Sequence, residues 1–210
     1  MAKGKSALAL ALKKKIGSND EIQKVTHWID TGFPPLNKAI SGRYDGGFPC
    51  GRIVEVFGPP SAGKTFLATA AMISAQKQDG LAVFLDHENS FDVGLAVANG
   101  LNADEDDGQW VYKQPDTFED SVELIGTILK LVRDEELIPE SAPICIVADS
   151  LASMVPNSKA EKFEKMAEGT AKDKDQLNMN DNTALARATS ANFPTLALWA
   201  RKYNACIIFL

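Results

Sequence analysis

One eight-residue run in this sequence has the composition of a phosphate-binding loop. It matches the pattern G-x-x-x-x-G-K-[ST] in full and reads Gly58-Pro59-Pro60-Ser61-Ala62-Gly63-Lys64-Thr65. The glycines allow the backbone to curl until successive N–H groups face a phosphate. Lys64 then supplies positive charge to the β- and γ-phosphates, and Thr65 supplies a hydroxyl oxygen to Mg²⁺. This run and the next residue, Phe66, are therefore the predicted contacts of a nucleotide and Mg²⁺.

A carboxylate is also needed near Thr65, to order the water ligands of the metal ion from the opposite side. Asp149 closes the apolar run 144–148 and is the expected second residue of the Mg²⁺ site. An acid at the end of a strand can instead begin a capping turn, a role that Ser150 can also fill.

Hydrolysis requires in addition a group that orients or deprotonates water. Asp86, His87, Glu88 and Asp92 follow the apolar run 81–85, which places them at the same rim as the phosphate-binding loop. Glu88 is the expected water-activating carboxylate, because phosphoryl transfer to water needs a positioned acceptor. Asp86 and His87 are the alternatives. For His87 taken alone, and for His27, a structural hydrogen-bonding role is the simpler interpretation.

The elements that must position these side chains follow from short apolar runs rich in Val, Ile and Phe. Such runs are typical of parallel strands buried on both faces, and they cover residues 52–57, 81–85, 110–113, 144–148 and 205–210. Helical patterns cover 5–16, 64–78, 118–136 and 184–203; Thr117 and Asp120 can cap the third, and Pro194 should kink the last or split it after Asn192. Strands alternating with helices predict an α/β fold with a mostly parallel, doubly wound sheet flanked by helices.

Two regions are expected along the chain. Residues 1–45 form a short N-terminal helix and a lead-in, and residues 46–210 form the nucleotide-binding core. Turn formers dominate 17–50, where one small strand is expected. The run 206–210 is a buried-type strand with nothing after it, so we expect a core that is incomplete at its C-terminus, with slow hydrolysis and weak DNA affinity.

Composition excludes several classes of protein. The chain has 210 residues, 45% of them hydrophobic, and a net charge of −6, which argues against disorder and against coating DNA through bulk charge. A local basic group of lysines at positions 3, 5, 13, 14 and 15 is the exception. No apolar run approaches the roughly 20 residues of a membrane helix, and no secretory signal is evident, so no membrane partner and a cytoplasmic location are expected. Cys50, Cys145 and Cys206 are expected to be reduced core thiols.

These motifs, in their order and spacing, resemble the RecA-type strand-exchange ATPases. The resemblance is carried by the run 51–57 leading into the phosphate-binding loop, by 84–92, by 114–117 and by 147–150; it is close over 28–155 and looser over 184–210. It implies a RecA-like P-loop NTPase core and a DNA-dependent ATPase that uses ATP and Mg²⁺. It also implies filaments on single-stranded DNA, pairing with double-stranded DNA, and a role in recombination and repair.

By the same resemblance, particular residues acquire roles. Glu88 matches the catalytic glutamate, Lys64 and Thr65 the phosphate and magnesium ligands, Asp149 the second acid of the Mg²⁺ site, and Asp92 an acid near the adenine. The N-terminal helix resembles the element that packs on the next protomer of a homo-oligomer.

Some positions depart from the family pattern. Leu95 stands where the family often has an aromatic ring against adenine, and 156–182, in the place of the first DNA-binding loop, is longer than the bacterial form. This segment, with balanced lysines and acids, is expected to be a solvated loop. Together with the N-terminus it suggests a phage-encoded member. Other RecA-fold machines, such as a hexameric helicase ring or a KaiC-like or RadA-like ATPase, and a nucleotide-dependent regulatory assembly module are the alternatives.

Overall fold

The structure is a computed structural model that describes residues 2–16, 24–171, 181 and 183–210. Its centre is a five-stranded, wholly parallel sheet in the order β3-β7-β6-β4-β5. The strands are β3 (Arg52–Glu55), β4 (Leu81–Asp86), β5 (Trp110–Lys113), β6 (Ile144–Asp149) and β7 (Ala205–Phe209). The five strands predicted from apolar runs are therefore confirmed, with small shifts at their ends.

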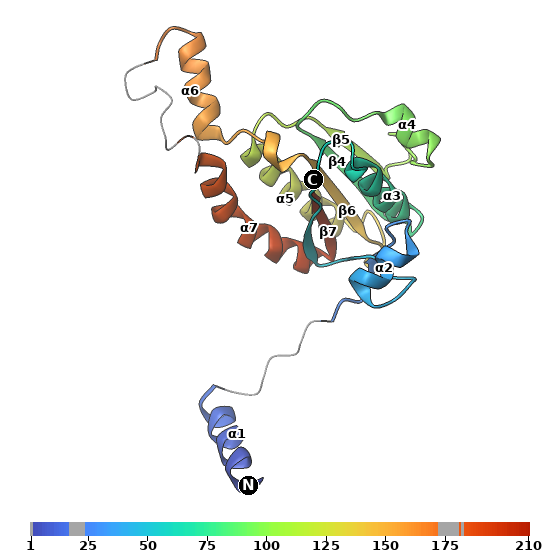
Figure 1. The fold of residues 1–210 in the computed structure, drawn as a ribbon, viewed down its shortest axis with the longest axis vertical. Helices are drawn as coiled ribbons and strands as arrows, with labels where there is room; N and C mark the ends of the chain where they lie inside the picture. The colour runs from blue at the N-terminus through green and yellow to red at the C-terminus, as the bar shows by residue number, and fades with distance from the viewer. Residues whose placement is uncertain (1, 17–23, 172–180, 182) are drawn as a thin grey trace.

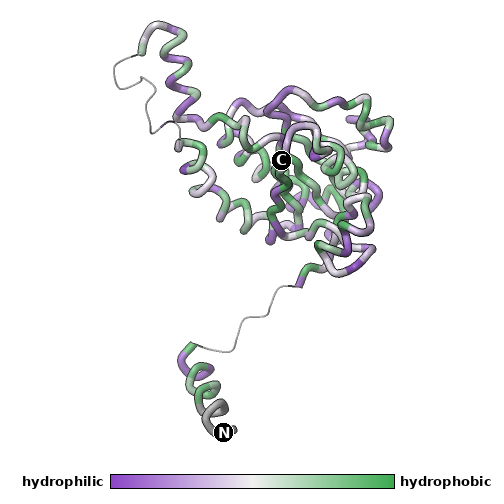
Figure 2. Tube along the Cα trace, viewed as in Figure 1, coloured by the Kyte–Doolittle hydropathy of each residue, from purple (hydrophilic) through white to green (hydrophobic). Residues whose placement is uncertain are grey.

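Helices cover both faces of the sheet (Figure 1). On one face α3 (Lys64–Gln76) and α4 (Val93–Ala98) bury apolar side chains against the strands, and on the other α5 (Phe118–Asp134) and α7 (Ala184–Tyr203) do so. The hydrophobic centre of the sheet lies between these helices (Figure 2). The RecA-like α/β core predicted from the sequence is confirmed. Its three central strands, β4, β6 and β7, are buried on both faces, whereas the edge strands β3 and β5 are only partly buried.

The start of α5 is fixed by its sequence. The Thr117 hydroxyl accepts a hydrogen bond from the Asp120 N–H (3.1 Å), and the Asp120 carboxylate accepts one from the Thr117 N–H (3.0 Å). This reciprocal contact confirms the predicted cap.

Pro194 does not split α7, so that alternative is wrong. The helix runs from Ala184 to Tyr203 with the proline inside it. A proline in a helix interior costs about 3 kcal/mol or more, but Leu196 and Ala200 on the same helix are fully buried against the sheet. Burial of residues beyond the proline holds the helix in one piece.

The N-terminal region contains more structure than its turn formers suggest. A two-stranded antiparallel ribbon pairs β1 (Trp28–Ile29) with β2 (Phe48–Pro49), and α2 (Pro34–Ser41) lies between them. The expectation of a single small strand is wrong, because two short strands are present and pair with each other. The helix α2 is compatible with its two prolines, because Pro34 and Pro35 occupy its first turn, where a missing N–H breaks no helical bond.

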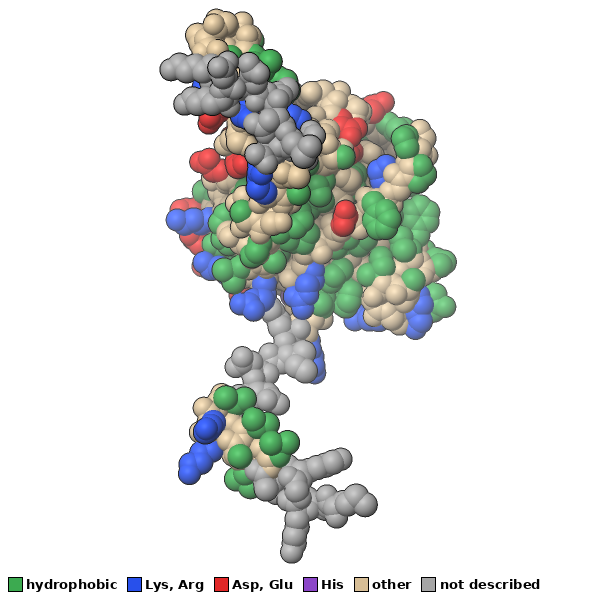
Figure 3. Space-filling model, turned by 60° about the vertical axis from the view of Figure 1, so that its left-hand side comes forward, with side chains coloured by type: hydrophobic (Ala, Val, Ile, Leu, Met, Phe, Trp, Pro, Cys, Tyr) green, Lys and Arg blue, Asp and Glu red, His purple; other side chains and the backbone are tan. Residues whose placement is uncertain are grey.

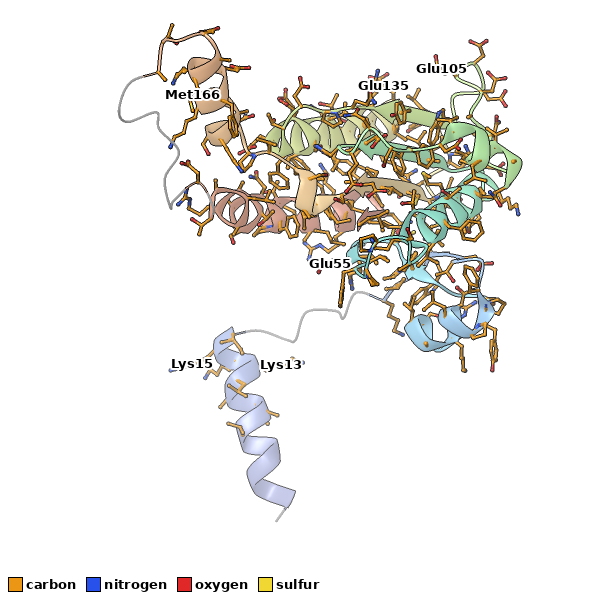
Figure 4. The ribbon with its side chains drawn as sticks, turned by 45° about the horizontal axis from the view of Figure 1, so that its top comes forward. Lys13, Lys15, Glu55, Glu105, Glu135 and Met166 are labelled. Atoms are coloured by element: carbon orange, nitrogen blue, oxygen red, sulfur yellow. The ribbon has the colours of Figure 1, made fainter. Side chains whose placement is uncertain are left out.

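The predicted N-terminal helix is present as α1 (Ala2–Ile16), and it lies away from the core (Figure 1). Every side chain from Leu8 to Ile16 is exposed, including the apolar Leu8, Leu10, Leu12 and Ile16. Apolar side chains are spread over the face of this helix that Figure 3 shows, and Lys13 and Lys15 project from it in different directions (Figure 4).

The segment after β6 also differs from its prediction. A short 3₁₀ turn, η1 (Leu151–Ser153), leads into α6 (Asn157–Ala167), which carries Met166 away from the core (Figure 4). The expectation of a solvated loop across 156–182 is therefore wrong for α6, whose Ala, Lys and Glu residues are strong helix formers. Residues 172–180 and 182 of that predicted loop lie outside the described residues.

The three cysteines lie in the core. All three cysteines are free and buried, and burial raises the pKa of Cys50 to about 12 and also raises those of Cys145 and Cys206. Such thiols are unreactive, which confirms their prediction as core residues.

Within the described parts of the chain, no helix is both long and apolar enough to cross a bilayer.

Candidate nucleotide-binding site

The phosphate-binding loop connects β3 to α3 at the carboxyl end of the sheet. Its tight path needs left-handed backbone at Ser61 (φ 60°) and at Gly63 (φ 85°), the residue that caps α3. A side chain at Gly63 would be strained by this backbone, although the space beside its Cα is open. The backbone N–H groups that begin α3 are thus placed at the positive end of a helix dipole, the usual surroundings of a bound phosphate.

The Lys64 side chain folds back over this loop. Its Nζ donates hydrogen bonds to the carbonyl oxygens of Gly58 and Pro59, both at 3.2 Å. The ammonium group is therefore held above the loop, where it can exchange these neutral acceptors for the oxygens of an anion.

Thr65 and Asp149 meet across the site although they are far apart in sequence. The Thr65 hydroxyl donates to Asp149 Oδ2 at 2.9 Å. Asp149 ends β6 and is in register with Asp86 at the end of β4, so the sheet itself fixes the carboxylate opposite the loop. One hydroxyl and one carboxylate oxygen suit Mg²⁺, which prefers oxygen ligands and keeps several waters.

Glu88 lies next to this pair. Its Oε1 accepts a hydrogen bond from the Ser150 hydroxyl, and Ser150 directly follows Asp149. Burial, together with the negative charges of Glu88 and Asp86, raises the pKa of Asp149, while the Thr65 hydrogen bond and the Lys64 charge oppose that rise. The structure therefore brings together Lys64, Thr65, Asp149 and Glu88 at one rim.

The carboxylate of Asp86, an alternative to Glu88, is hydrogen-bonded within its own loop. Its buried carboxylate accepts hydrogen bonds from the N–H groups of Glu88, Ser90 and Phe91 and from the Tyr112 hydroxyl. Burial and the Asp86 hydrogen bond both raise the pKa of Tyr112. Asp86 thus organises the turn that carries Glu88 and has no remaining role as an acceptor for water.

The histidines have structural positions. His87 Nε2 lies 2.6 Å from Ser121 Oγ, and burial lowers the pKa of His87 despite the nearby Asp86 and Asp120. His27 Nδ1 lies 2.9 Å from Asn204 Nδ2 at the far end of the sheet. These contacts agree with the structural interpretation of both residues.

A cavity of about 230 Å³ adjoins Thr65, between α3 and α4. Phe66, Asp92, Leu95 and Asn99 are among its lining residues. Asp92 also caps α4, since its Oδ1 accepts a hydrogen bond from the Leu95 N–H at 2.8 Å. Leu95 is 59% exposed at the edge of this cavity, and Phe66 is 49% exposed and touches Phe33 edge-on. The cavity suits the base of a nucleotide whose phosphates lie on the loop.

A larger cavity, of about 750 Å³, lies elsewhere. It is lined by Arg133, by 136–140 and by 202–204, at the amino ends of β6 and β7. None of the predicted site residues borders it, so its volume has no bearing on the candidate site.

Comparison with known proteins decides the family. The sequence matches the RecA N-terminal domain over residues 6–194, which is most of the chain. The chain belongs to the RecA family. The "Protein RecA" of Desulforapulum autotrophicum is 40% identical over 147 residues, covering 70% of this chain and 37% of that relative. The "Protein RecA" of Oceanobacillus iheyensis is 37% identical over 172 residues, covering 77% of this chain and 44% of the relative.

A third RecA relative, from Treponema denticola, is 39% identical over 145 residues, covering 69% of this chain and 31% of the relative. The chain thus spans less than half the length of each of these relatives. The RecA matches do not favour the helicase, KaiC-like or regulatory alternatives.

Sequence reasoning missed two members of the RecA-like site. Tyr112 anchors Asp86 from β5, and the Ser150 hydroxyl contacts Glu88. Ser150 was visible only as a possible capping residue, which it also is, since it begins η1. Its position directly after a strand-end acid is the signal that could have placed it at the rim.

Proposed function

We propose that this chain is the nucleotide-binding part of an ATP-dependent DNA recombinase. It binds ATP with Mg²⁺, hydrolyses it to ADP and phosphate when DNA is bound, and acts as a homo-oligomeric filament on single-stranded DNA that pairs with double-stranded DNA. The observation that carries the proposal is the Thr65–Asp149 contact beside Lys64 and Glu88, in a chain of the RecA family.

Each residue of the site has a proposed role. The loop 58–65 binds the phosphates through its N–H groups, and Lys64 moves from the loop carbonyls to the β- and γ-phosphates. Thr65 and Asp149 hold Mg²⁺, which neutralises the phosphate charge when bound. Glu88 orients the attacking water and accepts its proton. Phe66 and Asp92 lie against the base side of the nucleotide.

The two regions of the chain have separate proposed roles. Residues 46–210 form the ATPase core, and residues 1–45 include the element that packs on a neighbouring protomer. The exposed apolar residues of α1 support a packing role for the N-terminal helix, whereas β1 pairs with β2 across the 45/46 boundary and Ile29 is buried with the core. A cytoplasmic location stays a prediction.

The proposal is tested by nucleotide binding and by single-turnover hydrolysis with protein in excess, each with and without single-stranded DNA. Wild-type protein should bind MgATP and release phosphate faster with DNA. Lys64→Ala should weaken MgATP binding at least tenfold, because it removes a charge-assisted contact to two phosphates. Lys77→Ala, an exposed lysine at the other end of α3, is the matched control and should bind normally.

Different failures would point to different alternatives. Absence of DNA-stimulated phosphate release together with absence of filaments by electron microscopy would contradict the recombinase. Rings of fixed size with unwinding activity would favour a helicase. Unchanged hydrolysis in Glu88→Gln would favour a regulatory module that binds ATP without using this carboxylate.

A further inference from the structure

The loop that ends β6 contains a hydroxyl aimed at the candidate water-activating group. Ser150 is 8% exposed, and its Oγ donates a hydrogen bond to Glu88 Oε1. Glu88 itself is exposed, and its backbone N–H is held by Asp86 Oδ1 at 3.1 Å. Its main chain is therefore fixed by one carboxylate, while Ser150 restrains its flexible side chain.

Ser150 is in turn held by its own turn. The Ser153 hydroxyl donates to the Ser150 carbonyl at 2.7 Å and accepts from the Ser150 N–H at 3.3 Å. The next residue, Leu151, donates its N–H to the Leu210 carbonyl at 2.8 Å. The Ser150 hydroxyl thus projects from a backbone that is fixed on both sides, as a positioning group requires.

We propose that Ser150 is a positioning residue that orients the Glu88 carboxylate for the attack of water on the bound nucleotide. The inference rests on the proposed function, because it assumes that Glu88 acts on that water. One carboxylate oxygen is occupied by the Ser150 hydroxyl, and the other stays available to accept a proton from water. Ser150 does not touch the nucleotide, so its effect is exerted through Glu88.

A purely structural role for Ser150 is the competing explanation. Ser150 and Ser153 form the reciprocal cap of η1, and a cap alone would make Ser150 important for folding. The two roles separate by variant. Ser153→Ala removes the cap contacts and the 3.3 Å contact between the Ser153 and Ser150 hydroxyls, but it keeps the Ser150 hydroxyl and the Leu151–Leu210 hydrogen bond that holds the backbone beside it. Ser150→Thr keeps a hydroxyl at the same position.

The experiment measures single-turnover ATP hydrolysis, MgATP affinity and thermal unfolding of the full chain with single-stranded DNA. Ser150→Ala should slow hydrolysis about 10- to 100-fold, with MgATP affinity within about twofold of wild type, because misorienting a general base costs rate and not ground-state binding. Ser150→Thr should retain most of the rate, and Ser153→Ala should remain within a few-fold of wild type. Ser141→Ala, an exposed serine in the turn before β6, is the neutral control.

A double variant decides whether Ser150 acts through Glu88. If it does, Ser150→Ala should add no further loss in the Glu88→Gln background, because residues that act as one unit are non-additive. A full additional loss there, or a wild-type rate in Ser150→Ala, would overturn the inference. Should Ser150→Ala not fold, Ser150→Cys preserves the shape with a weaker donor and should show the same slow hydrolysis.

The outcomes also separate this inference from the proposed function. If the wild-type protein hydrolyses ATP no faster than Glu88→Gln, the role of Glu88 is contradicted, and the inference about Ser150 is overturned with it. If Glu88→Gln hydrolyses ATP clearly more slowly than wild type and Ser150→Ala hydrolyses it at the wild-type rate, the inference about Ser150 is overturned and the proposed function is not.

Discussion

Asp149 bears the main electrostatic cost of the candidate site. It is 6% exposed and lies near Glu88 and Asp86, so three carboxylates share one rim with a single lysine. Burial and like charges favour the neutral form, which is the physical cause of its raised pKa. A metal ion bound there would relieve this repulsion, so the site is more stable with Mg²⁺ than without it.

The raised pKa of Asp149 makes the stability of the folded protein depend on pH. Because the folded protein binds the Asp149 proton more tightly than the unfolded chain, the stabilising effect of protonation is present at acidic pH and is lost as pH rises through the raised pKa. Asp149→Asn should therefore raise Tm by a few degrees at neutral pH, and the gain should shrink as the pH is lowered.

The same variant should weaken Mg²⁺-dependent nucleotide binding at least tenfold, because a neutral amide is a poorer Mg²⁺ ligand. Thermal unfolding across pH, without and with MgATP, measures both effects. A lower Tm in Asp149→Asn at neutral pH would contradict the electrostatic argument.

At this scale, local motifs were predictable and tertiary partners were not. The phosphate-binding loop and Glu88 could be identified because the residues that define each motif are adjacent in the sequence. Tyr112 and Asp86 could not be paired, because 26 residues separate them and only the β4–β5 register brings them together. A sequence pattern fixes residue type and spacing, and the sheet decides which hydroxyl reaches which carboxylate.

Helix α5 contacts α7 closely at one glycine. A Cβ atom on Gly126 would lie 2.7 Å from the ring of Trp199. Real carbon atoms do not approach so closely, so a side chain there must displace the indole ring. The absence of a side chain at position 126 lets the two helices pack on the same face of the sheet.

Gly126→Ala tests this contact, because the variant shows whether a side chain at position 126 raises or lowers the stability of the protein. In an open helix the change would stabilise by about 1 kcal/mol, because alanine is the better helix former. Overpacking costs about 1–3 kcal/mol, so we expect net destabilisation and a lower denaturation midpoint. Adding Trp199→Leu should reverse part of that loss in a double-mutant cycle. A more stable single variant would show that the indole moves freely.

The elements that escaped prediction are short or belong to polar segments. α4 has six residues and α2 begins with two prolines, so neither shows a helical period long enough to detect. α6 has balanced charges that are also typical of a solvated loop. The long apolar strands were predictable because burial on both faces leaves a continuous hydrophobic run.

The whole molecule consists of a packed core and a helix that lies apart from it. Removal of residues 1–23 should leave the Tm of the core within about 1 °C of wild type, because the side chains of residues 8–16 are exposed and α1 lies away from the core. The same removal should reduce self-association, if α1 packs on a second copy. Differential scanning fluorimetry and sedimentation velocity measure the two effects. A large fall in Tm would show that α1 stabilises its own core.

The pairing of β3 has a consequence for biosynthesis. The strand that carries the phosphate-binding loop is hydrogen-bonded in this sheet to β7 alone, and Val56 N–H reaches the Phe209 carbonyl at 2.9 Å. A ribosome synthesises residues 52–55 long before 205–209. β3 and the loop that follows it therefore lack their neighbouring strand while some 150 residues are added, at about 5–20 residues per second. For those seconds β3 lacks its hydrogen-bonded neighbour, and the β3–β7 pairing that supports the phosphate-binding loop forms only after β7 has emerged from the exit tunnel.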